Sequence, residues 1–171
     1  MKNKRLTYVA MGALLAAMIS YIEVFFTPFI PIPGMKLGFS NLVLLIGLLY
    51  LPFGDVLLIG LMKTIFIVLF TGAVSSMFYS MPATFVSILT MRCGMVAKPY
   101  ISNVGVSVFG SLGNNMTQVI VSYFMLQSTA YFYYLPMMIL VGTLTGSIIG
   151  FIANEMEKRS IFRRQEWNRR K

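Results

Sequence analysis

The sequence contains no histidine and one cysteine, Cys93, among its 171 residues. Zinc, haem and copper sites are usually built from these two residue types, so the composition argues against such metal centres. A single cysteine also excludes a disulfide within the chain. Acidic residues are scarce too, because Asp55 is the only aspartate and the four glutamates are scattered.

These shortages bear directly on catalysis. Metal-dependent phosphate chemistry usually needs clustered carboxylates to hold Mg²⁺, and the sequence has no such cluster. A serine nucleophile would lack a histidine base, and no glycine-rich phosphate loop of the Walker type is present. We therefore expect no catalytic residues, no bound metal and no cofactor, and we interpret the chain as a protein that is not an enzyme.

Apolar residues are abundant: 57% of the chain is hydrophobic and only 11% is charged, with a mean hydropathy of +0.78. Such values are typical of a polytopic membrane protein. At roughly 20 residues for each helical span, the length allows about six spans. The fold class predicted is an all-α membrane protein, a six-transmembrane-helix bundle over residues 1–154 followed by a basic tail over residues 155–171.

The six predicted spans cover approximately residues 6–27, 39–51, 55–71, 76–91, 103–122 and 135–154. Ten of the fourteen basic residues lie in the two tails, and Arg92 and Lys98 fall in a loop on the same side. The positive-inside rule then places both termini in the cytoplasm of a multi-pass protein of the bacterial cell membrane. Basic tails beside apolar spans attract anionic lipid headgroups, and this distribution disfavours a nucleic-acid partner.

The fifth predicted span carries a stripe of polar side chains at helical spacing. Successive members are four, four, three, four and four residues apart, which places them on one helix face. Unpaired amides in hydrocarbon cost several kcal/mol, so this polar stripe must face other helices or a cavity. Its six members are Asn103, Ser107, Ser111, Asn114, Gln118 and Ser122, and Asn115 lies just beside them.

Three ionisable residues stand out from the apolar sequence: Glu23 near the end of the first span, Lys36 in a proline-rich loop, and Lys63 at mid-span. A lysine at mid-membrane depth indicates a functional site, although a snorkelling side chain is the alternative. We expect Glu23 and Lys63 to line one cavity at different depths. With Lys36 and Lys63, the amides of Asn114, Asn115 and Gln118 are expected to contact a polar or anionic small molecule there. Amides of this kind also cross-link helices, and for Asn115 the two interpretations are equally supported.

Small residues recur at four-residue spacing in two spans. Ala13 and Ala17 form such a pair in the first span, and Gly142, Gly146 and Gly150 form a series in the sixth. Small residues at this spacing let two helices approach closely. For the glycines, we expect packing within the chain rather than a dimer contact.

Several of these segments resemble a known family. They are the run from Pro33 to Asn41 (Pro-Gly-Met-Lys-Leu-Gly-Phe-Ser-Asn), the segment from Ser102 to Gln118, and the residues around Lys63. Together they resemble the Gx transporter family, which also carries the label heptaprenyl diphosphate synthase component I. The resemblance extends over residues 6–153. One departure is the pair Asn114–Asn115, where the family usually shows His-Asn.

That family is similar to the substrate-binding S-components of energy-coupling-factor (ECF) transporters. The resemblance implies a receptor for a micronutrient outside the cell, with a transmembrane coupling subunit and ATPase subunits as partners. It implies docking of the coupling subunit on Ala13 and Ala17. Asn41, which ends the Pro33–Asn41 segment, and Tyr79, as one of the aromatic walls of the site, complete the expected substrate-binding residues. Two alternatives are an accessory subunit for prenyl diphosphate or quinone synthesis or flavin-linked electron transfer, and a self-contained channel or carrier.

Overall fold

The computed structural model describes residues 2–26, 36–97 and 100–169, and it describes side chains for residues 5–25, 36–97 and 100–159. All regular elements in these ranges are helices. Their bounds are α1 (Lys2–Phe26), α2 (Asn41–Tyr50), α3 (Phe53–Thr71), α4 (Ser75–Val96), α5 (Asn103–Leu126), α6 (Ala130–Tyr133) and α7 (Leu135–Arg169). The all-helical prediction is confirmed for this part of the chain.

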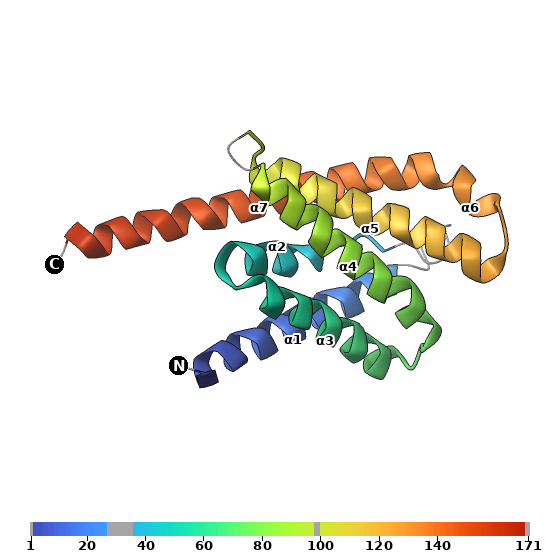
Figure 1. The fold of residues 1–171 in the computed structure, drawn as a ribbon, viewed down its shortest axis with the longest axis horizontal. Helices are drawn as coiled ribbons and strands as arrows, with labels where there is room; N and C mark the ends of the chain where they lie inside the picture. The colour runs from blue at the N-terminus through green and yellow to red at the C-terminus, as the bar shows by residue number, and fades with distance from the viewer. Residues whose placement is uncertain (1, 27–35, 98–99, 170–171) are drawn as a thin grey trace.

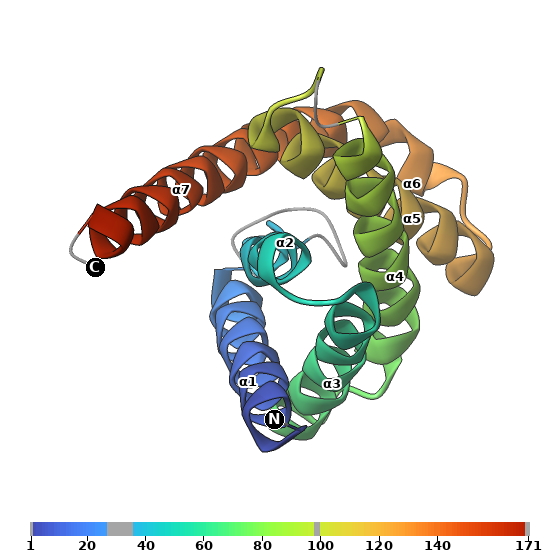
Figure 2. The same ribbon diagram turned by 60° about the vertical axis from the view of Figure 1, so that its left-hand side comes forward.

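The short helix α2 occupies the centre of the molecule. It contacts each of the five long helices, and these follow one another around it in the order α1, α3, α4, α5 and α7 (Figure 2). Most of the residues of α2 are buried or half-buried, and Leu44 and Leu45 are fully enclosed. A central helix that is apolar on all sides is what such enclosure requires.

Local sequence explains where several helices begin and end. Helix α3 starts directly after Pro52 and ends at Gly72, whose φ of 67° is a left-handed conformation that glycine adopts without strain. Helix α5 begins after Ser102, whose hydroxyl accepts a hydrogen bond from the Gly105 backbone N–H. Helix α4 continues through Pro82, which lies inside the helix.

Helices α5 and α7 pack at very close range through glycines. A methyl group at Gly150 would lie 2.4 Å from the Cα of Val104, and one at Gly146 would lie 2.9 Å from the Cα of Val108. Backbone atoms cannot move aside as flexible side chains can, so only glycine allows this approach. The prediction that these glycines pack within the chain is confirmed.

The structure contradicts the prediction that Ala13 and Ala17 dock a partner subunit. Both side chains have no exposed surface, because they face the other helices of this chain. The opposite side of α1 is exposed and carries large apolar side chains, including Met11, Leu15 and Met18. The small residues Ala13 and Ala17, four residues apart, do mark a close helix contact, but this contact is with other helices of the same chain.

Three helices are long and apolar enough to cross a membrane: residues 5–25 of α1, the whole of α3, and residues 135–159 of α7. They indicate that the protein associates with a membrane. Helix α2 has ten residues and is therefore about 15 Å long, half the roughly 30 Å thickness of the hydrocarbon core. The prediction of six spans is therefore not established, since α2 alone is too short to be one.

Helix α7 differs from the predicted sixth span in its length. It continues without a break from Leu135 to Arg169, so no change of secondary structure separates residues 1–154 from the basic tail. Its carboxyl-terminal part projects away from the other helices, and both chain ends lie toward the same end of the molecule (Figure 1). Most of the proline-rich loop, including Pro33, lies outside the described residues, as does Lys98.

Candidate functional site: a polar cavity around the start of α2

The helices enclose a narrow cavity at the amino-terminal end of α2. The enclosed space is small, about 10 Å³, which is room for about one water molecule. Six predicted substrate-binding residues line it, and they come from α1, α2, α3, α5 and the segment that leads into α2. They are Glu23, Lys36, Asn41, Lys63, Asn114 and Gln118.

Glu23 connects the end of α1 to the beginning of α2. One carboxylate oxygen accepts a hydrogen bond from the Ser40 backbone N–H at 2.9 Å, and the other accepts one from the Gly38 N–H at 3.3 Å. Gly38 has a φ of 82°, which turns the chain so that it enters the helix. Both N–H groups belong to the turn that leads into α2, and the helix dipole favours a carboxylate near this end of the helix. Glu23 therefore caps this turn, and it also brings a charge into the cavity.

Lys36 reaches into the cavity from the segment that precedes α2. Its ammonium donates a hydrogen bond to the Ser80 hydroxyl on α4. The side chain is half-buried, and the negative charge of Glu23 lies close enough to attract it. The contact with Ser80 connects the α1–α2 segment to α4 across the cavity.

Lys63 lies in the middle of α3 with only 6% of its surface exposed. It is close enough to Glu23 and Lys36 to interact electrostatically with both. None of the hydrogen bonds found between described residues involves the Lys63 ammonium. A buried ammonium without a hydrogen-bond acceptor is costly, so the site favours an acceptor that enters the cavity.

Two amide groups add unpaired hydrogen-bonding atoms. The Asn41 Nδ2 donor and the Gln118 Oε1 acceptor are buried and have no partner among the described residues. Buried polar groups in folded proteins are almost always paired, so each exception needs an explanation. A molecule bound in the cavity would supply an acceptor for one and a donor for the other.

Two predicted site residues lie outside the cavity. Asn115 is buried, but its Nδ2 donates a hydrogen bond to the Met138 backbone oxygen on α7 at 2.8 Å, and its Oδ1 accepts one from Asn114 at 3.4 Å. Asn115 therefore positions Asn114 instead of lining the cavity. Tyr79 is half-buried, and its neighbour Ser80 lines the cavity in its place.

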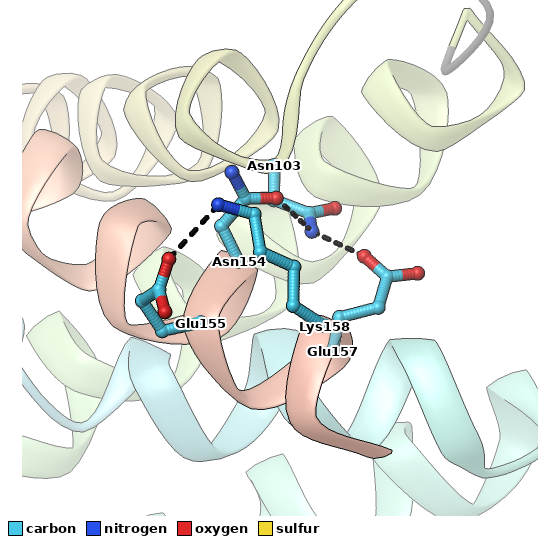
Figure 3. A network of polar contacts seen from close by, with 5 residues as sticks. All are labelled: Asn103, Asn154, Glu155, Glu157 and Lys158. Atoms are coloured by element: carbon cyan, nitrogen blue, oxygen red, sulfur yellow. Dashed lines mark hydrogen bonds and ion pairs between the residues drawn. The ribbon is translucent and has the colours of Figure 1, made fainter. Parts of the chain in front are cut away.

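The polar stripe of α5 is confirmed as a buried face, since each of its six members is at most 5% exposed. Only Asn114 and Gln118 reach the cavity. At the other end of the stripe, the Asn103 amide donates hydrogen bonds to Asn154 Oδ1 at 3.2 Å and to a carboxylate oxygen of Glu157 (Figure 3). This end of the stripe connects α5 to α7.

Five hydroxyl residues that line the cavity were not predicted from the sequence: Ser20, Ser40, Thr64, Ser80 and Thr84. Each lies within four residues of another lining residue along the chain. Ser80 and Thr84 are four residues apart, which repeats the spacing of Asn114 with Gln118, and the other pairs are one or three residues apart. A search for such pairs in every apolar segment would have found them.

An all-helical, membrane-associated protein with a polar cavity among its helices is thus defined by the fold and the site. A family model described as heptaprenyl diphosphate synthase component I matches residues 13–156, and the chain belongs to this family. No curated protein and no solved structure matches it.

Proposed function

We propose that the chain is the substrate-binding membrane component of an ATP-driven importer of the ECF type, which captures a small polar or anionic molecule from outside. The observation that carries this proposal is the cavity, where charged and unpaired polar groups are enclosed within a bundle of apolar helices. Concave sites with a few convergent polar groups are the usual form of small-molecule sites.

An ion pair between α1 and α3 supports a six-crossing topology. The Arg5 guanidinium contacts both carboxylate oxygens of Asp55 at 2.6 Å, so the two helices begin at the same level. Both run away from this level, and the chain between them must return across the same thickness. A return made by α2 and residues 36–40 supports six crossings with both termini on one side of the membrane.

The short length of α2 suits this arrangement. Non-helical backbone is tolerated at membrane depth only where protein buries it or where it lines a cavity. Residues 36–40 meet this condition, because Lys36, Gly38 and Ser40 all line the cavity. In transporters, interrupted helices of this kind carry the substrate site near mid-membrane depth.

The family description favours a second candidate function. It names one component of a synthase, which suggests a membrane accessory subunit for prenyl diphosphate or quinone synthesis. The scarcity of carboxylates favours a non-catalytic role in that assembly as well. In this case the protein acts by contact with a soluble partner, and the cavity binds no transported substrate.

Co-purification separates the two functions. The full chain, tagged and extracted from its native membrane in mild detergent, is expected to bring with it a second membrane protein and ATPase subunits. Recovery of a soluble prenyl diphosphate synthase whose activity falls on removal of this chain would replace the importer with the accessory role. Recovery of the chain alone, with no ATPase after mild cross-linking, would contradict the importer.

A further inference from the structure

The charges in the cavity do not cancel. Lys36 and Lys63 contribute two positive charges and Glu23 contributes one negative charge, so the three groups together carry a net charge of +1. In a low-dielectric interior an uncompensated charge is expensive. One negative charge bound in the cavity would bring the net charge of the site to zero and remove this cost.

The three charged groups differ in how far their hydrogen bonding is satisfied. Both oxygens of Glu23 already accept backbone N–H groups, and Lys36 donates to Ser80. Lys63 lines the cavity from α3 and donates no hydrogen bond to any described residue. The open position for an anion is therefore at Lys63.

Two neutral groups complete the pattern. Asn41 offers an unpaired N–H donor that can share an anionic oxygen with Lys63, since both residues line the same cavity. Gln118 offers an unpaired carbonyl oxygen, which can only accept. The site thus provides donors for a negative group and one acceptor for a separate donor.

We propose that the cavity binds a small monoanion that also carries a hydrogen-bond donor, such as a hydroxyl or amide N–H. Its negative group binds Lys63 and Asn41, and its donor binds Gln118. This inference rests on the proposed function and specifies the substrate class for the same site. A cation would face two ammonium groups, and a neutral molecule would leave the charge of Lys63 uncompensated.

The probes for the test share one carbon skeleton and differ in charge or donor. Lactate carries one negative charge and a hydroxyl, lactamide is neutral, 1-amino-2-propanol is a cation, and propionate has the charge without the hydroxyl. Thermal unfolding of the full chain in detergent is measured against the concentration of each probe, with sodium chloride at equal ionic strength as the control salt. We expect lactate to stabilise the protein most and propionate less, while lactamide and the amine stabilise it no more than sodium chloride does.

Variants assign the effect to the cavity. Lys63→Met removes a buried charge that has no hydrogen-bond partner among the described residues, so the protein is expected to fold. The concentration of lactate needed for half of the stabilisation should rise at least about tenfold, as loss of a charged hydrogen bond implies. Gln118→Leu should remove the difference between lactate and propionate, and the exposed Lys158→Met should change neither.

Equal stabilisation by lactamide or by the amine would overturn the inference, and so would lactate stabilisation that persists unchanged in Lys63→Met. No stabilisation by any probe would overturn it as well. The importer itself is judged by co-purification, which does not depend on the charge of the ligand. An importer of a neutral or cationic substrate would therefore keep its ATPase partners and fail only this test.

Discussion

The two halves of α5 carry the same kinds of residues at the same spacing and yet do different things. In the amino-terminal half, Ser107 and Ser111 face the glycines of α7, and Asn103 bonds to Asn154 and Glu157. In the carboxyl-terminal half, Asn114 and Gln118 face the cavity. One polar stripe therefore has a packed end and an open end.

The segments that surround each end of the polar stripe determine whether that end is packed or faces the cavity. At the packed end, Gly146 and Gly150 let the backbone of α7 approach until no space is left. The Ser107 and Ser111 hydroxyls have no partner among the described residues, but serine can bond to its own helix by rotation. The Gln118 carbonyl oxygen at the open end also has no partner among the described residues, but it lines the cavity. Unpaired atoms beside free space therefore indicate a ligand, whereas those in a packed contact do not.

The largest effect is expected at the packed end. Gly150→Ala places a methyl group 2.4 Å from the Cα of Val104, so α5 and α7 must separate. Overpacking of this kind costs about 3 kcal/mol of unfolding free energy. Gly54→Ala is the matched control, because a methyl group there meets no atom within 4 Å. Thermal unfolding in detergent should show a large loss for Gly150→Ala only, and equal losses would contradict the described packing.

The next effect is expected at the start of α2. Glu23→Ala removes the acceptor for the Gly38 and Ser40 N–H groups and leaves Lys63 without a nearby negative charge. Hydrogen bonds to charged groups contribute about 2 kcal/mol each, but the bond from Gly38 is long at 3.3 Å, so a loss of about 2–3 kcal/mol is expected. Glu155→Ala removes a carboxylate paired only with exposed Lys158 among the described residues and should change stability little. Similar melting temperatures for the two variants would show that Glu23 is not a cap.

Substitutions of the adjacent residues Asn114 and Asn115 are expected to have smaller effects, one on ligand retention and the other on stability. Asn115→Ala removes the bond to Met138 O and should cost about 1 kcal/mol of stability. Asn114→Ala should leave the melting temperature nearly unchanged and weaken ligand retention, because Asn114 lines the cavity. Measuring both properties for both variants tests the boundary between the two ends. If Asn114→Ala lowered the melting temperature and Asn115→Ala weakened ligand retention, the assignment of Asn114 to the cavity and Asn115 to the packed contact would be wrong.

The smallest effect is expected for the ion pair between α1 and α3. Asp55→Asn weakens the contact with Arg5, and in this pair the Arg5 side chain is 59% exposed while the Asp55 side chain is 10% exposed. Exposed ion pairs contribute at most about 1 kcal/mol, and salt screens them. The variant should lower the melting temperature slightly at low salt and not at all at high salt. A large, salt-independent loss would mean that the pair is shielded from water.

Much of this organisation could be predicted from the sequence. The buried face of α5 follows from helical spacing, and the glycine contact follows from small residues four apart. Glu23 and Lys63 could be assigned to one cavity because an ionisable group in an apolar span needs a polar environment. These predictions depend only on local periodicity and on the cost of burying polar atoms.

The remainder depends on tertiary contacts that spacing does not specify. The pair Ala13 and Ala17 marks a close contact but not its partner, so the docking prediction was wrong. Spacing also could not separate Asn114 from Asn115, since both lie on the buried side of α5. The half-length of α2 was visible in the sequence, but its central position follows from contacts with all five long helices.

The most direct test of the central claim is native mass spectrometry of the full chain released from detergent, performed on the unaltered protein and on Lys63→Met in parallel. The account predicts a retained small molecule of reproducible mass on the unaltered protein and its loss from Lys63→Met, with Lys158→Met retaining it. Retention of the same molecule by Lys63→Met, or a protein purified from its native membrane without any bound small molecule, would contradict a receptor built around this cavity.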